Sequence, residues 1–126
     1  MRAIVDTSVL IAQESGRGLA DLPDELALSV ITTAELELGV LRARDTETRS
    51  RRLTTLTRAR ALLPVLPIDA EVGSCFARIA AAEREAGRSI RRHDAWIAAT
   101  ALRHGAAVVT QDADFGAFPD IEVVRV

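Results

Sequence analysis

The chain has 126 residues, of which 48% are hydrophobic and 27% charged, and its formal net charge is −2. This length supports one domain with a core that needs no cross-links, and the composition excludes a disordered chain. The apolar runs contain neither a membrane span nor a secretion signal. The single Cys75 can form no internal disulfide, and we expect a buried, inert thiol. We therefore expect a cytoplasmic protein with no membrane partner.

Apolar runs with strand character alternate along the chain with segments of helical period, which is typical of a βαβ domain with a parallel sheet. The predicted strands are residues 3–6, 26–30, 65–68, 106–110 and 121–125. The predicted helices are residues 32–43, 46–63, 70–86 and 94–103, and a further helix begins near Ser8. Because no linker or internal repeat divides these elements, we predict one domain over residues 1–126.

Acidic residues stand at the ends of predicted strands and the starts of predicted helices. Asp6 ends the first strand, Glu35 lies in the first turn of the helix from Thr32, and Asp94 opens the last helix. Asp112 and Asp114 follow the strand that ends at residue 110. In open α/β folds ligands bind at the carboxyl edge of the sheet, and the chain reversals would return all five acids to that edge.

Each acid taken alone also has a purely structural explanation. Asp6 and Asp94 could be helix N-caps, residues 32–35 fit a capping box, and residues 112–114 fit an Asx turn. The joint pattern favours a shared site over four separate coincidences.

Carboxylates that converge with no Lys or Arg between them repel one another, and a divalent cation relieves that repulsion. Oxygen-only ligation indicates Mg²⁺ or Mn²⁺, since Cys75, His93 and His104 lack the spacing of zinc ligands. Mg²⁺ keeps several waters and can hold a nucleophilic water beside a phosphate oxygen. The chemistry best served by such a site is hydrolysis of a phosphodiester.

Four segments carry a family resemblance: IVDTSVL (residues 4–10), TTAELELG (32–39), HDAWIAATAL (93–102) and VVTQDADF (108–115). In order and spacing they resemble the PIN-domain ribonucleases, and most closely the VapC-type toxins of bacterial toxin–antitoxin pairs. The resemblance covers essentially the whole chain. It implies an α/β, PIN-like three-layer α/β/α domain with a central, mostly parallel sheet. It also implies endonucleolytic cleavage of RNA by metal-activated water, without a covalent enzyme intermediate.

Carried over residue by residue, the resemblance implies a catalytic, metal-binding set of four acids: Asp6, Glu35, Asp94 and Asp112. Asp6 and Asp94 would be direct ligands of Mg²⁺ or Mn²⁺. The other two would bind the metal directly or through water, and either could orient the attacking water. Asp114 is a candidate fifth ligand. The family positions where a hydroxyl supports the acids are Thr7, Ser8 and Thr110.

The resemblance further implies a homodimer and a cognate VapB-type antitoxin whose C-terminal segment occludes the acidic groove. Two other functions stay open at this point. One is a housekeeping RNA-processing PIN nuclease without an antitoxin, against which the compact length of the chain argues. The other is a non-catalytic PIN-like interaction module, which would need degenerate acids, whereas all of them are present here.

All 16 basic residues are arginine, which suits recognition of a polyanion, although codon usage alone also explains the missing lysine. Within residues 42–60, Arg44, Arg51 and Arg58 recur every seven residues and share a helix face. That face could hold RNA backbone or an acidic partner, or be simply solvated. Likewise Arg91 and Arg92 could grip phosphates beside Asp94 or lie in a solvated loop. We expect the neighbouring His93 to be structural or solvent-facing rather than a general base.

Overall fold

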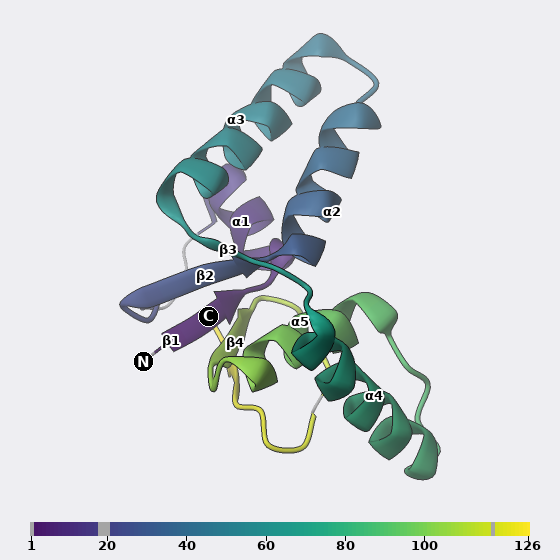
Figure 1. The fold of residues 1–126 in the computed structure, drawn as a ribbon. Helices are drawn as coiled ribbons and strands as arrows, with labels where there is room; N and C mark the ends of the chain where they lie inside the picture. Colours follow the sequence, from purple (N-terminus) through teal and green to yellow (C-terminus); the bar gives the residue numbers. More distant parts are fainter. Residues whose placement is uncertain (1, 18–20, 117) are drawn as a thin grey trace.

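The computed structural model describes residues 2–17, 21–116 and 118–126 and has a five-stranded sheet flanked by helices (Figure 1). The strands are β1 (Arg2–Val5), β2 (Glu25–Ser29), β3 (Val65–Leu66), β4 (Ala107–Thr110) and β5 (Val123–Arg125). The helices are α1 (Thr7–Glu14), α2 (Val30–Leu41), α3 (Thr46–Leu62), α4 (Ala70–Glu85) and α5 (Arg92–Arg103).

The strands lie in the order β3-β2-β1-β4-β5, and every described pairing is parallel. The chain moves from β1 to β2 on one side and later returns to β4 on the other side, so the strand order reverses between β1 and β4. A crevice opens at such a point beyond the carboxyl ends of the two strands. Asp6 follows β1 directly, and Asp112 lies two residues after β4, so both acids stand at this crevice.

Two apolar clusters fill the space on the two faces of the sheet. Side chains alternate between faces along a strand, so Ile4 packs into one cluster, whereas Ala3 and Val5 pack into the other. The first cluster joins the sheet to α4 and α5, and the second joins it to α1, α2 and α3 (Figure 1). The predicted three-layer α/β/α fold is confirmed.

The predicted elements are all present, with boundaries that differ by a few residues. The largest difference with a clear cause is at α2, which begins at Val30 instead of 32 because Ser29 is its N-cap. The Ser29 hydroxyl accepts a hydrogen bond from the Thr32 N–H at 3.1 Å. The capping box offered as a structural explanation of residues 32–35 therefore does not form, and the prediction that Glu35 lies in the first turn of its helix is wrong, because Glu35 lies in the second turn of α2.

Cys75 and Trp96 belong to the same side of the core. Cys75 is a free thiol with only 4% of its surface exposed, packed in the cluster with α4 and α5, and the predicted burial is confirmed. Trp96 packs on the same cluster, and its ring stacks on Phe76 with centroids 4.0 Å apart. Among the described residues, no helix is long and apolar enough to cross a membrane.

Candidate active site

Asp6 is placed at the switch point by the register of β1 and β4. Val5 pairs with Val109, so the next residues along, Asp6 and Thr110, lie side by side. The Thr110 hydroxyl donates to Asp6 Oδ2 at 2.8 Å, and the Ser8 hydroxyl donates to the same oxygen at 2.7 Å. Asp6 occupies the N-cap position of α1, but its side chain accepts no capping hydrogen bond. Its buried carboxylate is held by hydroxyls instead, and the structural explanation of Asp6 as a capping residue fails.

Glu35 reaches the same edge of the sheet from α2, on the other side of the crevice. The Thr7 hydroxyl donates to Glu35 Oε1 at 2.8 Å, and His93 Nδ1 lies 3.3 Å from Oε2. The Glu35 side chain is 30% exposed, so it can be reached from solvent. His93 is exposed, as expected, but it contacts a candidate catalytic acid, and the sequence reasoning did not predict that contact.

Asp94 lies in the first turn of α5, inside the helix and not at its N-cap, which is Arg91. Asp94 is buried, and its Oδ2 accepts no hydrogen bond. Burial raises the pKa of Asp94 from 3.8 to about 6; the charge of Arg91 opposes this rise, whereas the charges of three other acids add to it. Those acids are Asp6, Asp112 and Glu35. The other three predicted acids thus lie close enough to Asp94 to raise its pKa.

Asp112 and Asp114 lie in the loop after β4. The Asp114 N–H donates to Asp112 Oδ1 at 2.8 Å, which is the predicted Asx turn, and the Asp112 N–H donates to the Thr110 hydroxyl at 3.0 Å. The Asp112 side chain is 33% exposed. Thr110 therefore links the two strands of the switch point, because its single hydroxyl contacts both Asp6 and the backbone of Asp112.

Arg91 lies between acids of the site, which contradicts the expectation that no Arg separates them. Its guanidinium is 3.3 Å from Asp94 Oδ2 and 3.3 Å from Asp112 Oδ2. Within the described ranges, no group of three or more His, Cys, Asp or Glu side chains is arranged to hold a metal ion. The donor chemistry nonetheless fits a hard cation, since the acids supply only oxygen and Asp94 Oδ2 is a buried acceptor without a donor.

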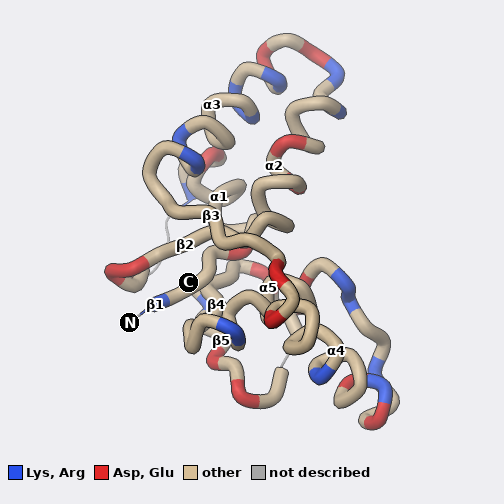
Figure 2. The backbone as a smooth tube through the Cα atoms, viewed as in Figure 1, with Lys and Arg blue, Asp and Glu red and all other residues tan. Residues whose placement is uncertain are grey.

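A shallow pocket of about 300 Å³ continues from the acids over α2. It begins at Glu35 and His93 and ends at Arg42 and Arg52. Figure 2 shows further basic segments along α3 and in the loop between α4 and α5. Arginines thus line the pocket beside Glu35 and also lie in the loop that leads into α5.

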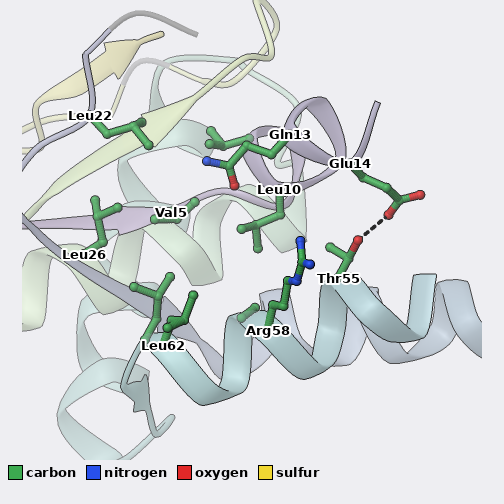
Figure 3. Close-up of a pocket in the computed structure, with 12 residues that line it drawn as sticks. Val5, Leu10, Gln13, Glu14, Leu22, Leu26, Thr55, Arg58 and Leu62 are labelled. Carbon is green, nitrogen blue, oxygen red and sulfur yellow. Dashed lines mark hydrogen bonds between the residues drawn. The ribbon is translucent and has the colours of Figure 1, made fainter. Parts of the chain in front are cut away.

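A larger cavity, of about 490 Å³, lies between α1, α3 and β2 and contains none of the predicted acids (Figure 3). Its wall is mainly aliphatic, and the Arg58 side chain extends into it between Leu10 and Thr55. Nearby, Arg51 Nε lies 3.2 Å from Glu14 Oε1, on a glutamate side chain that is only 6% exposed. Part of the predicted arginine stripe on α3 therefore packs against α1, so the stripe is not a uniformly free face.

The PIN domain family model matches residues 3–121, and the chain belongs to the PIN domain family. Within that family it is similar to VapC ribonucleases. Ribonuclease VapC5 of Mycobacterium tuberculosis is 43% identical, over 98% of this chain and 94% of that protein. Ribonuclease VapC4 of the same organism is 42% identical, over 99% of this chain and 97% of that protein.

The chain is also similar to solved structures. VapBC-5 from Mycobacterium tuberculosis, a member of the VapBC family of toxin–antitoxin systems, matches with a TM-score of 0.88 and 40% identity over 100% of both chains. FitAcB from Neisseria gonorrhoeae matches with a TM-score of 0.79 and 28% identity over 97% of this chain and 96% of that chain.

Proposed function

We propose that this chain is a VapC-type endoribonuclease that acts as the toxin of a toxin–antitoxin pair and hydrolyses RNA phosphodiester bonds. The relatives that match it over nearly its whole length are named ribonucleases, and a solved neighbour at 40% identity belongs to the VapBC toxin–antitoxin family. The observation that carries the proposal is the buried Asp94 carboxylate, whose Oδ2 accepts no hydrogen bond and whose pKa is raised by burial and by three nearby acids against the opposing charge of Arg91.

In this proposal the four acids hold a divalent cation, Mg²⁺ or Mn²⁺, with Asp6 and Asp94 as direct ligands. A cation bound there would supply charge stabilisation for the phosphodiester oxygens and acidify a water. The hydroxyls of Ser8 and Thr110 fix the orientation of the Asp6 carboxylate. Asp114 is exposed, so it serves at most as a peripheral fifth ligand.

Glu35 and Asp112 have the more accessible carboxylates of the four. We assign to them the orientation of the attacking water and acceptance of its proton. Thr7 and His93 hold the Glu35 carboxylate from two sides, which limits its rotation. The arginines near the site, such as Arg42 and Arg52 in the pocket beside Glu35, suit a polyanionic substrate, because arginine pairs well with phosphate.

A cognate VapB-type antitoxin is the protein partner that follows from this family placement. A homodimer, a single domain over residues 1–126 and a cytoplasmic location stay predictions. A gene for a small DNA-binding antitoxin beside the gene for this chain would distinguish a toxin from a housekeeping PIN nuclease.

The test is cleavage of total RNA by the purified chain in Mg²⁺ or Mn²⁺, with and without chelator. Asp94→Asn keeps the size of the side chain and removes one ligand charge. Glu83→Gln is the matched control, because Glu83 is an equally buried acid outside the site. Discrete fragments that require metal, persist in Glu83→Gln and vanish in Asp94→Asn support the proposal. Cleavage that survives both chelator and Asp94→Asn would overturn the acidic-site mechanism, and a folded but silent wild type would favour an interaction module.

A further inference from the structure

The side chain of Arg91 crosses the mouth of the acidic site. Arg91 is the N-cap residue of α5 and has an extended backbone, with φ −86° and ψ 100°. Nη1 lies 3.3 Å from Asp94 Oδ2 and donates a hydrogen bond to the backbone carbonyl of Asp114, while Nη2 donates to Asp112 Oδ2 at 3.3 Å. One guanidinium therefore joins two of the four candidate metal-binding acids and the loop after β4.

We propose that Arg91 is an internal counter-ion that neutralises the site in the metal-free protein and competes with the divalent cation for Asp94 and Asp112. This inference rests on the proposed function, because it concerns the same acids. A guanidinium and a divalent cation cannot occupy the space between two carboxylates together, since both are positive and both need the same oxygens. Metal binding then requires Arg91 to move aside.

The contacts of Arg91 are suited to release. Both carboxylate distances are 3.3 Å, longer than the 2.7–2.9 Å that is usual for charge-assisted hydrogen bonds. Asp94 Oδ2 gains no hydrogen bond from the guanidinium despite its proximity, and the Arg91 side chain is 51% exposed. Apart from its hydrogen bond to the Asp114 carbonyl, the Arg91 guanidinium thus offsets the charge of the two carboxylates without the short contacts that would hold it firmly to them.

Space for the displaced side chain exists next to the site. A pocket of about 340 Å³ is lined by Arg91, Ser89 and Phe118 among others. At the start of the same loop, Arg88 is held separately by two hydrogen bonds that it donates to the Glu83 carboxylate at 3.0 and 2.8 Å. Only the side chain of Arg91 needs to turn.

The experiment measures Mn²⁺ binding to the purified full chain without RNA, by the electron paramagnetic resonance signal of free Mn²⁺. If Arg91 occupies the site in about nine molecules of ten, it weakens the apparent affinity about tenfold. We expect Arg91→Ala to bind Mn²⁺ about tenfold more tightly than the wild type. Arg91→Lys keeps the charge but cannot bridge two carboxylates as a planar fork, and we expect an intermediate affinity.

Arg92→Ala is the matched control, because it removes the same charge from the next residue, which is also exposed. We expect it to change the affinity by less than about twofold, as a screened surface charge does. Equal affinities of Arg91→Ala and Arg92→Ala, or weaker binding by Arg91→Ala, would overturn the inference while metal-dependent cleavage by the wild type stands. If no variant and not even the wild type binds Mn²⁺, both the inference and the proposed metal site fail. Should Arg91→Ala not fold, Arg91→Lys against Arg92→Ala decides the question.

Discussion

Two buried carboxylates on neighbouring helices of this protein have pKa values that are shifted in opposite directions. Glu83, near the end of α4, is 5% exposed and accepts two hydrogen bonds from Arg88, which lower the pKa of Glu83 below its usual value. Asp94, in the first turn of α5, is 8% exposed, and burial raises its pKa to about 6. At similar burial, the acid that accepts two hydrogen bonds from an arginine has a lowered pKa, and the acid whose Oδ2 accepts none has a raised pKa.

The largest expected effect is on cleavage. In Mg²⁺ or Mn²⁺ we expect Asp94→Asn to lower the rate of RNA cleavage more than about 100-fold, because it removes one of the two proposed direct ligands. Glu83→Gln should cleave near the wild-type rate, since Glu83 contacts none of the four acids. Gel assays under single-turnover conditions measure both rates. Equal losses in the two variants would show that the two acids do not differ in role.

Thr110→Val tests the hydroxyl that orients the acids of the site and leaves all four acids in place. The substitution keeps the shape of the side chain but removes the hydroxyl that contacts Asp6 Oδ2 and the Asp112 N–H. We expect metal affinity to fall about 10-fold to 100-fold, as measured by Mn²⁺ titration. Thr54→Val, at an exposed hydroxyl on α3 that donates only to a backbone carbonyl, should leave the affinity unchanged.

The pH dependence of stability distinguishes the two acids by sign. Asp94 has a folded pKa of about 6, above its usual 3.8, so the folded state binds the proton more tightly than the unfolded state does. The stabilisation that protonation of Asp94 gives to the folded state is complete below about pH 4 and is lost as the pH rises through about 6. We expect metal-free Asp94→Asn to exceed the wild type in free energy of unfolding by about 1–3 kcal/mol at pH 8. Urea denaturation at pH 4 and pH 8 measures this difference in free energy of unfolding, and we expect it to be smaller at pH 4. An equal difference at both pH values would contradict the raised pKa of Asp94.

Glu83 should give the opposite result and the smallest effect. Its folded pKa is lowered, so its contribution is present above the unfolded value of about 4.5 and is lost as the pH falls. Glu83→Gln should lower the free energy of unfolding by about 1–2 kcal/mol at pH 7, because the charge-assisted hydrogen bonds to Arg88 are weakened. Urea denaturation at pH 7 and pH 4 tests this, and a loss that grows in acid would refute it.

The sequence determined the elements and the chemical type of the site because both depend on local patterns. The alternation of apolar runs and helical periods predicted all five strands, the positions of five acids predicted a shared site, and the family resemblance reduced these to a set of four. Local rules also misled where two of them competed. Ser29 and Thr32 are both good N-caps, and in the structure β2 runs directly into α2 at Ser29, which is the cap. Asp6 occupies the N-cap position of α1, yet its carboxylate caps no backbone N–H and accepts hydrogen bonds from Ser8 and Thr110 instead.

What only the tertiary structure decided are the contacts between distant parts of the chain. The strand order puts β1 beside β4, which brings Thr110 to Asp6 across more than a hundred residues. The same packing places Arg91 against Asp112 and His93 against Glu35. No sequence spacing encodes these neighbours, because register and helix packing are set by burial of whole faces against one another. The sequence by itself therefore determined which acids the protein has, and the fold decided that Asp94 Oδ2 is buried beside Arg91 without accepting a hydrogen bond.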